Sequence, residues 1–250
     1  MKNLLIYINP RKWFDKESEI FFKIQVDNSL ELGWKHEDII FVANFDYEYN
    51  GVKSLIVPDN VYCKGFEKST KCNAVIYLFD NNLVNDDIYW CHDLDAWQLE
   101  PISEKELDLD KDAGFCDYGR KPLWQMGSYF FKNTSEDIFK EIASRVKPCY
   151  DIYRREQNEE YALLYLTDNN INGINDRIKR INNTYDFGMR KIELCYQKAN
   201  KPLKVVHFYP YSEKKWKMNP IKIVMYGMNE INIPLMNERL IKIFKKYGIE

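Results

Sequence analysis

Two aspartates separated by one residue form a candidate metal site. Asp93 and Asp95 follow directly after the apolar segment DIYWC at 87–91, which is typical of a buried strand. Ligands of open α/β sheets bind just beyond the carboxyl ends of such strands. Two carboxylates at positions i and i+2 can share one divalent cation, Mn²⁺ or Mg²⁺, whose other positions take water and substrate phosphates. We therefore expect Asp93 and Asp95 to hold a cation that neutralises a leaving diphosphate. A solvated loop is the alternative interpretation of this common pattern.

A second segment offers a nitrogen ligand and positive charge. His207 leaves the apolar run VVHF at 205–208, and imidazole is a common ligand for cations of this kind. We expect His207 to complete the metal site of Asp93 and Asp95, and a structural histidine is the alternative. Lys215 follows a few residues later and can hold phosphate oxygens as a point charge.

Polar residues around the start of a predicted helix at 159–166 are the third candidate group. Glu156, Gln157 and Glu159 precede or open this amphipathic segment. As catalytic residues they would hold sugar hydroxyls or act in a transfer step. As ordinary helix chemistry they cap the first turn and complement the helix dipole. The functional interpretation depends on the other two motifs, and both interpretations stay open.

Alternating strand and helix patterns must position these groups. Strands are predicted at 4–8, 38–45, 53–57, 87–91, 123–131, 189–195 and 204–208, and helices at 17–32, 69–79, 135–145, 159–166 and 233–247. The polar, acidic residues 100–122 are predicted to form a long loop. Strands separated by helical connections indicate an α/β fold with a mostly parallel, doubly wound central sheet flanked by helices.

Length and cysteine usage limit the class of protein. The 250 residues, 45% of them hydrophobic, suffice for one large α/β domain, and without an internal repeat or linker we expect a single domain over 1–250. The 6 cysteines are scattered without metal-ligand spacing, which indicates reduced thiols and a cytoplasmic protein, in the host cytoplasm if the gene is viral. The apolar start is too short for a signal peptide, and no segment approaches the roughly 18 apolar residues of a transmembrane helix.

Charge is divided unevenly along the chain. Residues 1–125 hold 14 Lys and Arg against 23 Asp and Glu, a balance of −9, whereas residues 126–250 hold 22 against 15, a balance of +7. The formal net charge of −2 hides this asymmetry. We expect the two halves to face different ligands, so a polyanionic partner is not excluded. Solvated helix faces are the alternative explanation.

The order of these motifs resembles that of GT-A type glycosyltransferases, most closely the glycogenin and galactinol synthase group. That group has an Asp-x-Asp after a central strand, and later a His-Phe-x-Gly followed by Lys-Pro-Trp. Here the aspartate pair is followed by His207-Phe208-Tyr209-Pro210 and by Lys215-Trp216, with Pro210 in place of the glycine. The group also carries an Asp-Gln pair, which Glu156-Gln157 resembles with Glu for Asp.

The resemblance implies a GT-A (Rossmann-like) fold, with 1–125 as the nucleotide-sugar-binding half and 126–250 as the acceptor-binding half. It implies that Asp93, Asp95 and His207 bind Mn²⁺ (or Mg²⁺), and that Lys215 lies near the diphosphate. Nucleotide base and ribose would be held by the end of the first strand and by the loop after the second. The residues concerned are Ile8, Asn9 and Asn44, and Trp216 is a further aromatic residue for stacking on a sugar or base.

The function that the resemblance implies is transfer of a sugar from a nucleoside diphosphate sugar, a UDP-sugar, to an acceptor hydroxyl. The acceptor is unknown; modified DNA and a surface glycan are candidates because the second half is basic. A nucleotidyltransferase, a metal-dependent nuclease and an inactive binding module are the alternatives. Nucleoside triphosphates would be consumed only by the first, and DNA would be cut without a donor only by the second. No Gly-x-Gly-x-x-Gly or P-loop motif is present, which disfavours dinucleotide redox enzymes and P-loop kinases.

Overall fold

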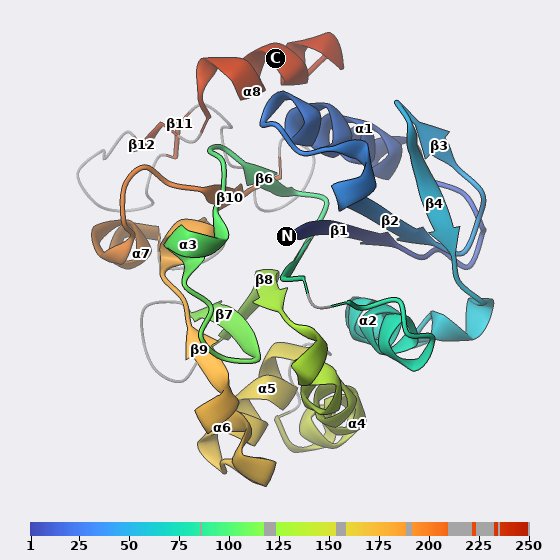
Figure 1. The fold of residues 1–250 in the computed structure, drawn as a ribbon, viewed down its shortest axis with the longest axis vertical. Helices are drawn as coiled ribbons and strands as arrows, with labels where there is room; N and C mark the ends of the chain where they lie inside the picture. The colour runs from blue at the N-terminus through green and yellow to red at the C-terminus, as the bar shows by residue number, and fades with distance from the viewer. Residues whose placement is uncertain are drawn as a thin grey trace.

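A computed structural model describes most of the chain. The described residues are 1–85, 87–117, 124–153, 159–188, 192–209, 222–223, 233–234 and 236–249. They form a central sheet with helices on both faces (Figure 1). Glu156, Gln157, Lys215 and Trp216 lie outside the described residues.

The central sheet has eight strands among the described residues, in the order β3-β4-β2-β1-β5-β8-β7-β9. The strands are β1 (Lys2–Tyr7), β2 (Ile39–Ala43), β3 (Glu48–Tyr49), β4 (Val52–Ile56), β5 (Tyr89–His92), β7 (Ala113–Asp117), β8 (Trp124–Phe131) and β9 (Ile178–Arg180). Strands β4, β2, β1 and β5 run parallel, and β7 runs parallel to β9. Strand β8 runs antiparallel to both of its neighbours. The mostly parallel α/β sheet that the sequence predicts is therefore confirmed.

Helices cover both faces of this sheet because its strands alternate apolar residues between the two sides. The helices are α1 (Lys16–Glu31), α2 (Thr70–Asp80), α3 (Glu104–Leu107), α4 (Glu136–Tyr153), α5 (Glu159–Asp168), α6 (Ile174–Arg177), α7 (Ile192–Lys198) and α8 (Glu238–Lys246). On β1, Leu4 belongs to the core shared with α2, α4 and α5, whereas Leu5 packs in the core beneath α1. Helix α8 packs on α1 through a further apolar cluster (Figure 1).

Each end of helix α1 is set by a residue close to that end in the sequence. The Asp15 carboxylate accepts hydrogen bonds from the backbone N–H groups of Glu17 and Ser18, which caps the first turn. The helix ends before Gly33, which adopts a φ of +91°. That left-handed conformation is accessible to glycine at little cost, so the chain leaves the helix there.

A short second sheet joins segments that are far apart in the sequence. Strand β6 (Ala96–Gln98) pairs antiparallel with β10 (Val205–His207), so that His207 lies opposite Ala96. The indole N–H of Trp97 donates to the Phe208 carbonyl at 3.0 Å. This pairing attaches the region around residue 207 to the turn that follows β5.

Three of the predicted segments differ in the structure. Residues 100–122 are not one long loop: they include α3 and the buried strand β7, which pairs with β8 along its five residues and with β9 through Ala113–Phe115. The acidic residues on either side of Ala113–Cys116 make so short an apolar run hard to recognise in the sequence. The strand predicted at 189–195 is wrong for its described part, because residues 192–198 form helix α7. The last helix begins at Glu238 rather than at 233, since Ile233–Pro234 form β12, which pairs with β11 (Lys222–Ile223).

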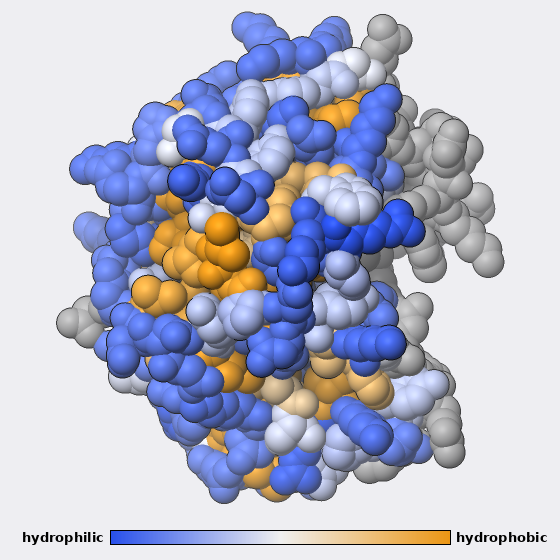
Figure 2. Space-filling model, turned by 90° about the vertical axis from the view of Figure 1, so that its right-hand side faces the viewer, coloured by the Kyte–Doolittle hydropathy of each residue, from blue (hydrophilic) through white to orange (hydrophobic). Residues whose placement is uncertain are grey.

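The surface is mainly hydrophilic where β3, β4 and α2 face outward. Figure 2 shows several groups of apolar side chains on this face, the largest of them left of the centre. Among the described residues, Trp13, Ile56 and Leu83 are the large hydrophobic side chains that are exposed. None of the described helices combines the length and the apolar character that crossing a bilayer requires.

Candidate metal centre

A tight turn after β5 presents Asp93 and Asp95 together. The Asp93 backbone N–H donates to the Gly127 carbonyl of β8 at 2.8 Å, and the Ala96 N–H donates to the Asp93 carbonyl at 3.0 Å. Strand β6 begins directly afterwards, so the two aspartates occupy the corner between two sheets. Because β5 is a central strand, this corner lies beyond the carboxyl ends of the parallel strands, as the sequence predicts.

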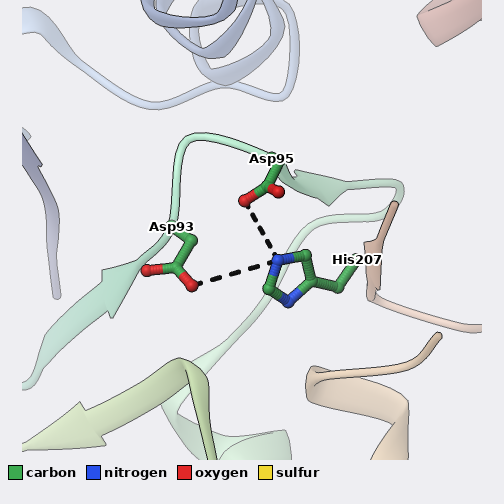
Figure 3. A group of neighbouring side chains, drawn as sticks. All are labelled: Asp93, Asp95 and His207. Atoms are coloured by element: carbon green, nitrogen blue, oxygen red, sulfur yellow. Dashed lines mark hydrogen bonds and ion pairs between the residues drawn. The ribbon is translucent and has the colours of Figure 1, made fainter. Parts of the chain in front are cut away.

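His207 reaches the same corner from β10 (Figure 3). Its Nε2 atom lies 3.0 Å from Asp95 Oδ1 and 3.9 Å from Asp93 Oδ2. One ligand atom from each of Asp93, Asp95 and His207 lies within 4.8 Å of the others. The imidazole is buried, whereas the two carboxylates are partly exposed towards a cavity.

The donor set fits a divalent cation of the Mn²⁺ or Mg²⁺ kind. Two carboxylate oxygens and one imidazole nitrogen are ligands that such ions accept. Neighbouring ligand atoms around an octahedral ion with bonds near 2.1 Å lie about 3 Å apart. The Asp95–His207 distance of 3.0 Å equals this spacing, and the Asp93–His207 distance is 3.9 Å.

Charge pairing already organises these side chains. Burial opposes the charged form of His207, but Asp95 and Asp186 outweigh it and raise the pKa of His207 well above its ordinary value. Burial would raise the pKa of Asp95, yet the charge and hydrogen bond of His207 lower it overall. The cluster therefore behaves as a carboxylate site that attracts positive charge, whether a proton or a metal ion.

Lys71 of α2 lies beside the cluster. Its Nζ atom donates to Asp93 Oδ1 at 2.7 Å and to the Met126 carbonyl at 2.5 Å, and it lies 3.4 Å from Glu159 Oε1. Burial lowers the pKa of Lys71, but the nearby Asp93 and Glu159 carboxylates raise it well above its ordinary value. Lys71 therefore stays charged and joins the metal cluster to the acidic start of α5.

Two glutamates at the start of α5 face the same cavity. Glu159 and Glu160 line a cavity of about 390 Å³ together with Lys71 and the metal cluster. Burial raises the pKa of Glu159, and burial followed by the charge of Glu159 raises the pKa of Glu160 to about 7. The Glu159 Oε2 atom is buried without a hydrogen-bond partner among the described residues. Such an atom is available to a ligand in the cavity.

The residues expected to hold the nucleotide lie at the mouth of this cavity or support it. Ile8 lines the cavity. Asn9 accepts the Arg11 N–H through its side-chain oxygen. The Asn44 side chain accepts the Asn9 N–H at 3.0 Å and donates to the Asn9 carbonyl at 2.9 Å, so it holds the loop after β1 in place. Contact of these three residues with a nucleotide stays a prediction.

His92 lies next to Asp93 in the chain, and its Nδ1 atom is 3.1 Å from the Asp93 backbone carbonyl oxygen. Its ring lies 2.9 Å from the Asn3 side-chain oxygen and stacks on Trp90. Burial lowers the pKa of His92 to about 3, so this ring is neutral at physiological pH. His92 is therefore a structural residue of the core.

Sequence reasoning missed Lys71, Glu160 and Asp186 as members of the site. Asp186 lies beneath His207, with its Oδ1 atom 3.6 Å from His207 Nδ1. Lys71 occupies the first turn of an ordinary helix, and Asp186 follows a short turn at Asn183–Tyr185. Neither Lys71 nor Asp186 belongs to a local sequence pattern that indicates a functional site. Glu160 follows Glu159 directly, so its position in the same first turn was the one available signal.

Comparisons with known proteins give matches among solved structures alone. No family model matches the chain, and no curated protein matches it. Two crystal structures of LgtC match with a TM-score of 0.58 at 14% identity, over 98% of this chain and 96% of LgtC. One is an active-site mutant, and the other is the galactosyltransferase in complex with donor and acceptor sugar analogs. A glycosyltransferase involved in glycosylation of the major capsid of PBCV-1 matches with a TM-score of 0.51 at 11% identity over 83% of this chain and 93% of its own. Mouse xyloside xylosyltransferase 1 matches with a TM-score of 0.52 at 8% identity over 83% of this chain and 97% of its own. The chain therefore has the fold of GT-A glycosyltransferases.

Proposed function

We propose that this protein is a metal-dependent glycosyltransferase that moves a sugar from a nucleoside diphosphate sugar, a UDP-sugar, to an acceptor hydroxyl. The observation that carries the proposal is the Asp93–Asp95–His207 cluster, which faces a cavity beyond the carboxyl ends of the parallel strands. The fold supports it, because a structural neighbour with this fold is a galactosyltransferase solved with donor and acceptor sugar analogs.

Asp93, Asp95 and His207 would hold the cation, Mn²⁺ or Mg²⁺. Such a cation, when bound, neutralises the negative charge of the departing diphosphate. The partial exposure of both carboxylates towards the cavity leaves room for phosphate oxygens beside them. Lys215 is proposed to stand near the diphosphate, as the resemblance to the glycogenin and galactinol synthase group implies, and Trp216 to stack on a sugar or base.

Lys71, Glu159 and Glu160 are proposed to face the donor sugar. They line the cavity next to the metal cluster and bring donors and acceptors of hydrogen bonds to one place. The unpartnered Glu159 Oε2 atom supports a contact with a sugar hydroxyl. Glu160, with a pKa of about 7, can hold or release a proton near neutral pH. Glu156 and Gln157 stay candidates for the same task.

The nucleotide is proposed to bind at the end of β1. Ile8 borders the cavity, and the Asn44 amide fixes the backbone of Asn9 beside it. A loop held by these two hydrogen bonds supports the proposal that base and ribose bind there. The acceptor is proposed to meet the half at 126–250, and the basic balance of that half favours modified DNA or an anionic surface glycan.

A donor-hydrolysis screen tests the proposal. The full chain is incubated with UDP-sugars and other sugar nucleotides in Mn²⁺, alongside the variants Asp95→Asn and Asp87→Asn. Asp95 follows the end of β5, whereas Asp87 lies before the start of that strand, near the N-terminal amine. Asp87 is therefore a matched control. We expect one donor class to be consumed by the wild type and by Asp87→Asn, and at least a hundredfold slower by Asp95→Asn. Consumption of no donor, or equal rates in all three proteins, would contradict the proposal. Consumption of nucleoside triphosphates instead would favour a nucleotidyltransferase.

A further inference from the structure

Asp186 is a buried carboxylate in contact with a proposed metal ligand. It is 1% exposed, and its Oδ2 atom accepts the backbone N–H of Ser128 at 3.0 Å. Its Oδ1 atom lies 3.6 Å from His207 Nδ1. Both of these atoms are buried without a hydrogen-bond partner among the described residues. Two orphaned polar atoms that face each other at this distance are one small movement away from a hydrogen bond.

The backbone holds the two residues in register. The Phe187 N–H donates to the Val205 carbonyl at 3.0 Å, and the His207 N–H donates to the Phe187 carbonyl at 2.6 Å. Phe187 also forms a parallel bridge with Val206. Because Phe187 makes these bonds, they hold the backbone of its neighbour Asp186 beside β10.

Two glycines lie against His207, one at its ring and one at its backbone. A Cβ atom on Gly127 would lie 2.5 Å from His207 Nδ1 and 3.3 Å from Asp186 Oδ2. A Cβ atom on Gly188 would lie 2.5 Å from the His207 carbonyl oxygen. The ring therefore packs closely against β8 at Gly127, and the segment that follows Asp186 packs against the His207 backbone. Such packing costs side-chain entropy, and it serves a ring that has to keep one orientation.

We propose that Asp186 is a positioning residue that accepts the Nδ1–H of His207 and so directs Nε2 towards Asp93 and Asp95. The inference rests on the metal-dependent function proposed above. An imidazole that binds a cation through Nε2 carries its proton on Nδ1, and a carboxylate there fixes the tautomer and the ring orientation and makes Nε2 a stronger ligand. Asp186 needs no contact with the cation or with a substrate for this task.

The test measures cation affinity in the full chain without any reaction. Mn²⁺ binding is followed by isothermal titration calorimetry for the wild type, Asp186→Ala, Asp186→Asn and Asp27→Asn. Asp27 is the matched control, since it is a buried carboxylate that accepts hydrogen bonds from Tyr247 and Lys246 away from the cluster. We expect Asp186→Ala to weaken Mn²⁺ binding about 10–100-fold. Asp186→Asn, which keeps an oxygen acceptor, is expected to lose less, and Asp27→Asn to bind as the wild type does.

A spectroscopic measurement separates positioning from mere structural support. With Zn²⁺ as a diamagnetic probe, the ¹⁵N signals of the His207 imidazole report which nitrogen carries the proton. We expect a protonated Nδ1 in the wild type and in Asp27→Asn, and an altered Nδ1 signal in Asp186→Asn. Because asparagine has nearly the same shape as aspartate, Asp186→Asn keeps the protein folded if Asp186→Ala does not fold.

The outcomes distinguish this inference from the proposed function. A wild type that binds neither Mn²⁺ nor Zn²⁺ overturns both. A wild type that binds them, with Asp186 variants of equal affinity and an unchanged Nδ1 signal, overturns the positioning role alone. Gly127→Ala adds an independent check, because displacing the ring should weaken Mn²⁺ binding even though no charge is removed.

Discussion

At the scale of single residues, the site combines opposite charges in a partly buried place. Lys71 bonds to Asp93 and lies near Glu159, while His207 bonds to Asp95. Each buried charge has a partner, which avoids the cost of an isolated one. Glu160 lies beside Glu159, and its pKa of about 7 means that its protonation changes near neutral pH.

The raised pKa of Glu160 predicts a dependence of stability on pH. Burial and then the charge of Glu159 raise this pKa from 4.5 to about 7. Between these values the folded protein holds a proton that the unfolded chain has lost. The free energy of unfolding therefore falls as pH rises through this window, by at most about 1.4 kcal/mol per pH unit from this group.

Urea denaturation of metal-free protein between pH 4.5 and 7 checks this prediction. Glu160→Gln should reduce the slope of unfolding free energy against pH. Burial also raises the pKa of Glu159, which adds a slope of the same sign, so part of the dependence should remain. Glu136→Gln, at a partly exposed position on α4, should keep the slope of the wild type. Equal slopes in all three proteins would refute the role given to Glu160.

At the scale of elements, the pairing of β6 with β10 assembles the metal cluster. Asp95 directly precedes β6 and His207 ends β10, so their contact depends on the register of these two short strands. Trp97 of β6 secures this register, because its indole donates to the Phe208 carbonyl and packs against Phe244 of α8. Three residues per strand are too few to hold the pair without such packing.

We therefore predict that Trp97→Ala weakens Mn²⁺ binding as well as the fold. Removing this fully buried ring should cost about 3–5 kcal/mol of unfolding free energy. The matched control is Phe139→Ala on α4, an equally buried aromatic residue that packs behind the central sheet instead. Its unfolding free energy should fall by a similar amount, with Mn²⁺ affinity unchanged.

Chemical denaturation and calorimetry on the same samples distinguish these two effects. If both variants lose stability but keep the affinity of the wild type for Mn²⁺, the β6–β10 register does not control the site. Trp97→Phe, which removes the hydrogen bond and keeps most of the packing, serves if Trp97→Ala does not fold.

At the scale of the whole molecule, the cation is expected to stabilise the fold. The cluster joins the turn after β5 to β10, which lie 112 residues apart in the sequence, and an ion that binds the folded form alone adds stability. Mn²⁺ at about one hundred times its Kd should raise the unfolding free energy by about 2.7 kcal/mol. Thermal denaturation with and without Mn²⁺ measures this change.

The same variants that test activity test this prediction. Asp95→Asn should lose most of the stabilisation by Mn²⁺, and Asp87→Asn should keep it. Stabilisation of Asp95→Asn to the same extent as the wild type would place the Mn²⁺ site elsewhere in the chain.

Much of the fold and the centre of the site could be predicted from local patterns. The aspartate pair follows an apolar strand, and His207 lies at the end of another, so strand-end chemistry pointed to both. Strand β7 could not be predicted, because the four uncharged residues Ala113–Cys116 between acidic ones have no local signature and are fixed by pairing with β8 and β9. The segment at 192–198 forms a helix, although its apolar residues are also compatible with a strand.

The sequence by itself determined the alternation of strands and helices, the boundaries set by Asp15 and Gly33, and the residue types that suit a cation. These features depend on neighbours within a few positions. Only the tertiary structure decided that Lys71 and Glu160 share a cavity with that cluster and that Asp186 lies beneath His207. Such contacts join residues far apart in the chain, and strand register and packing, which no local pattern records, bring them together.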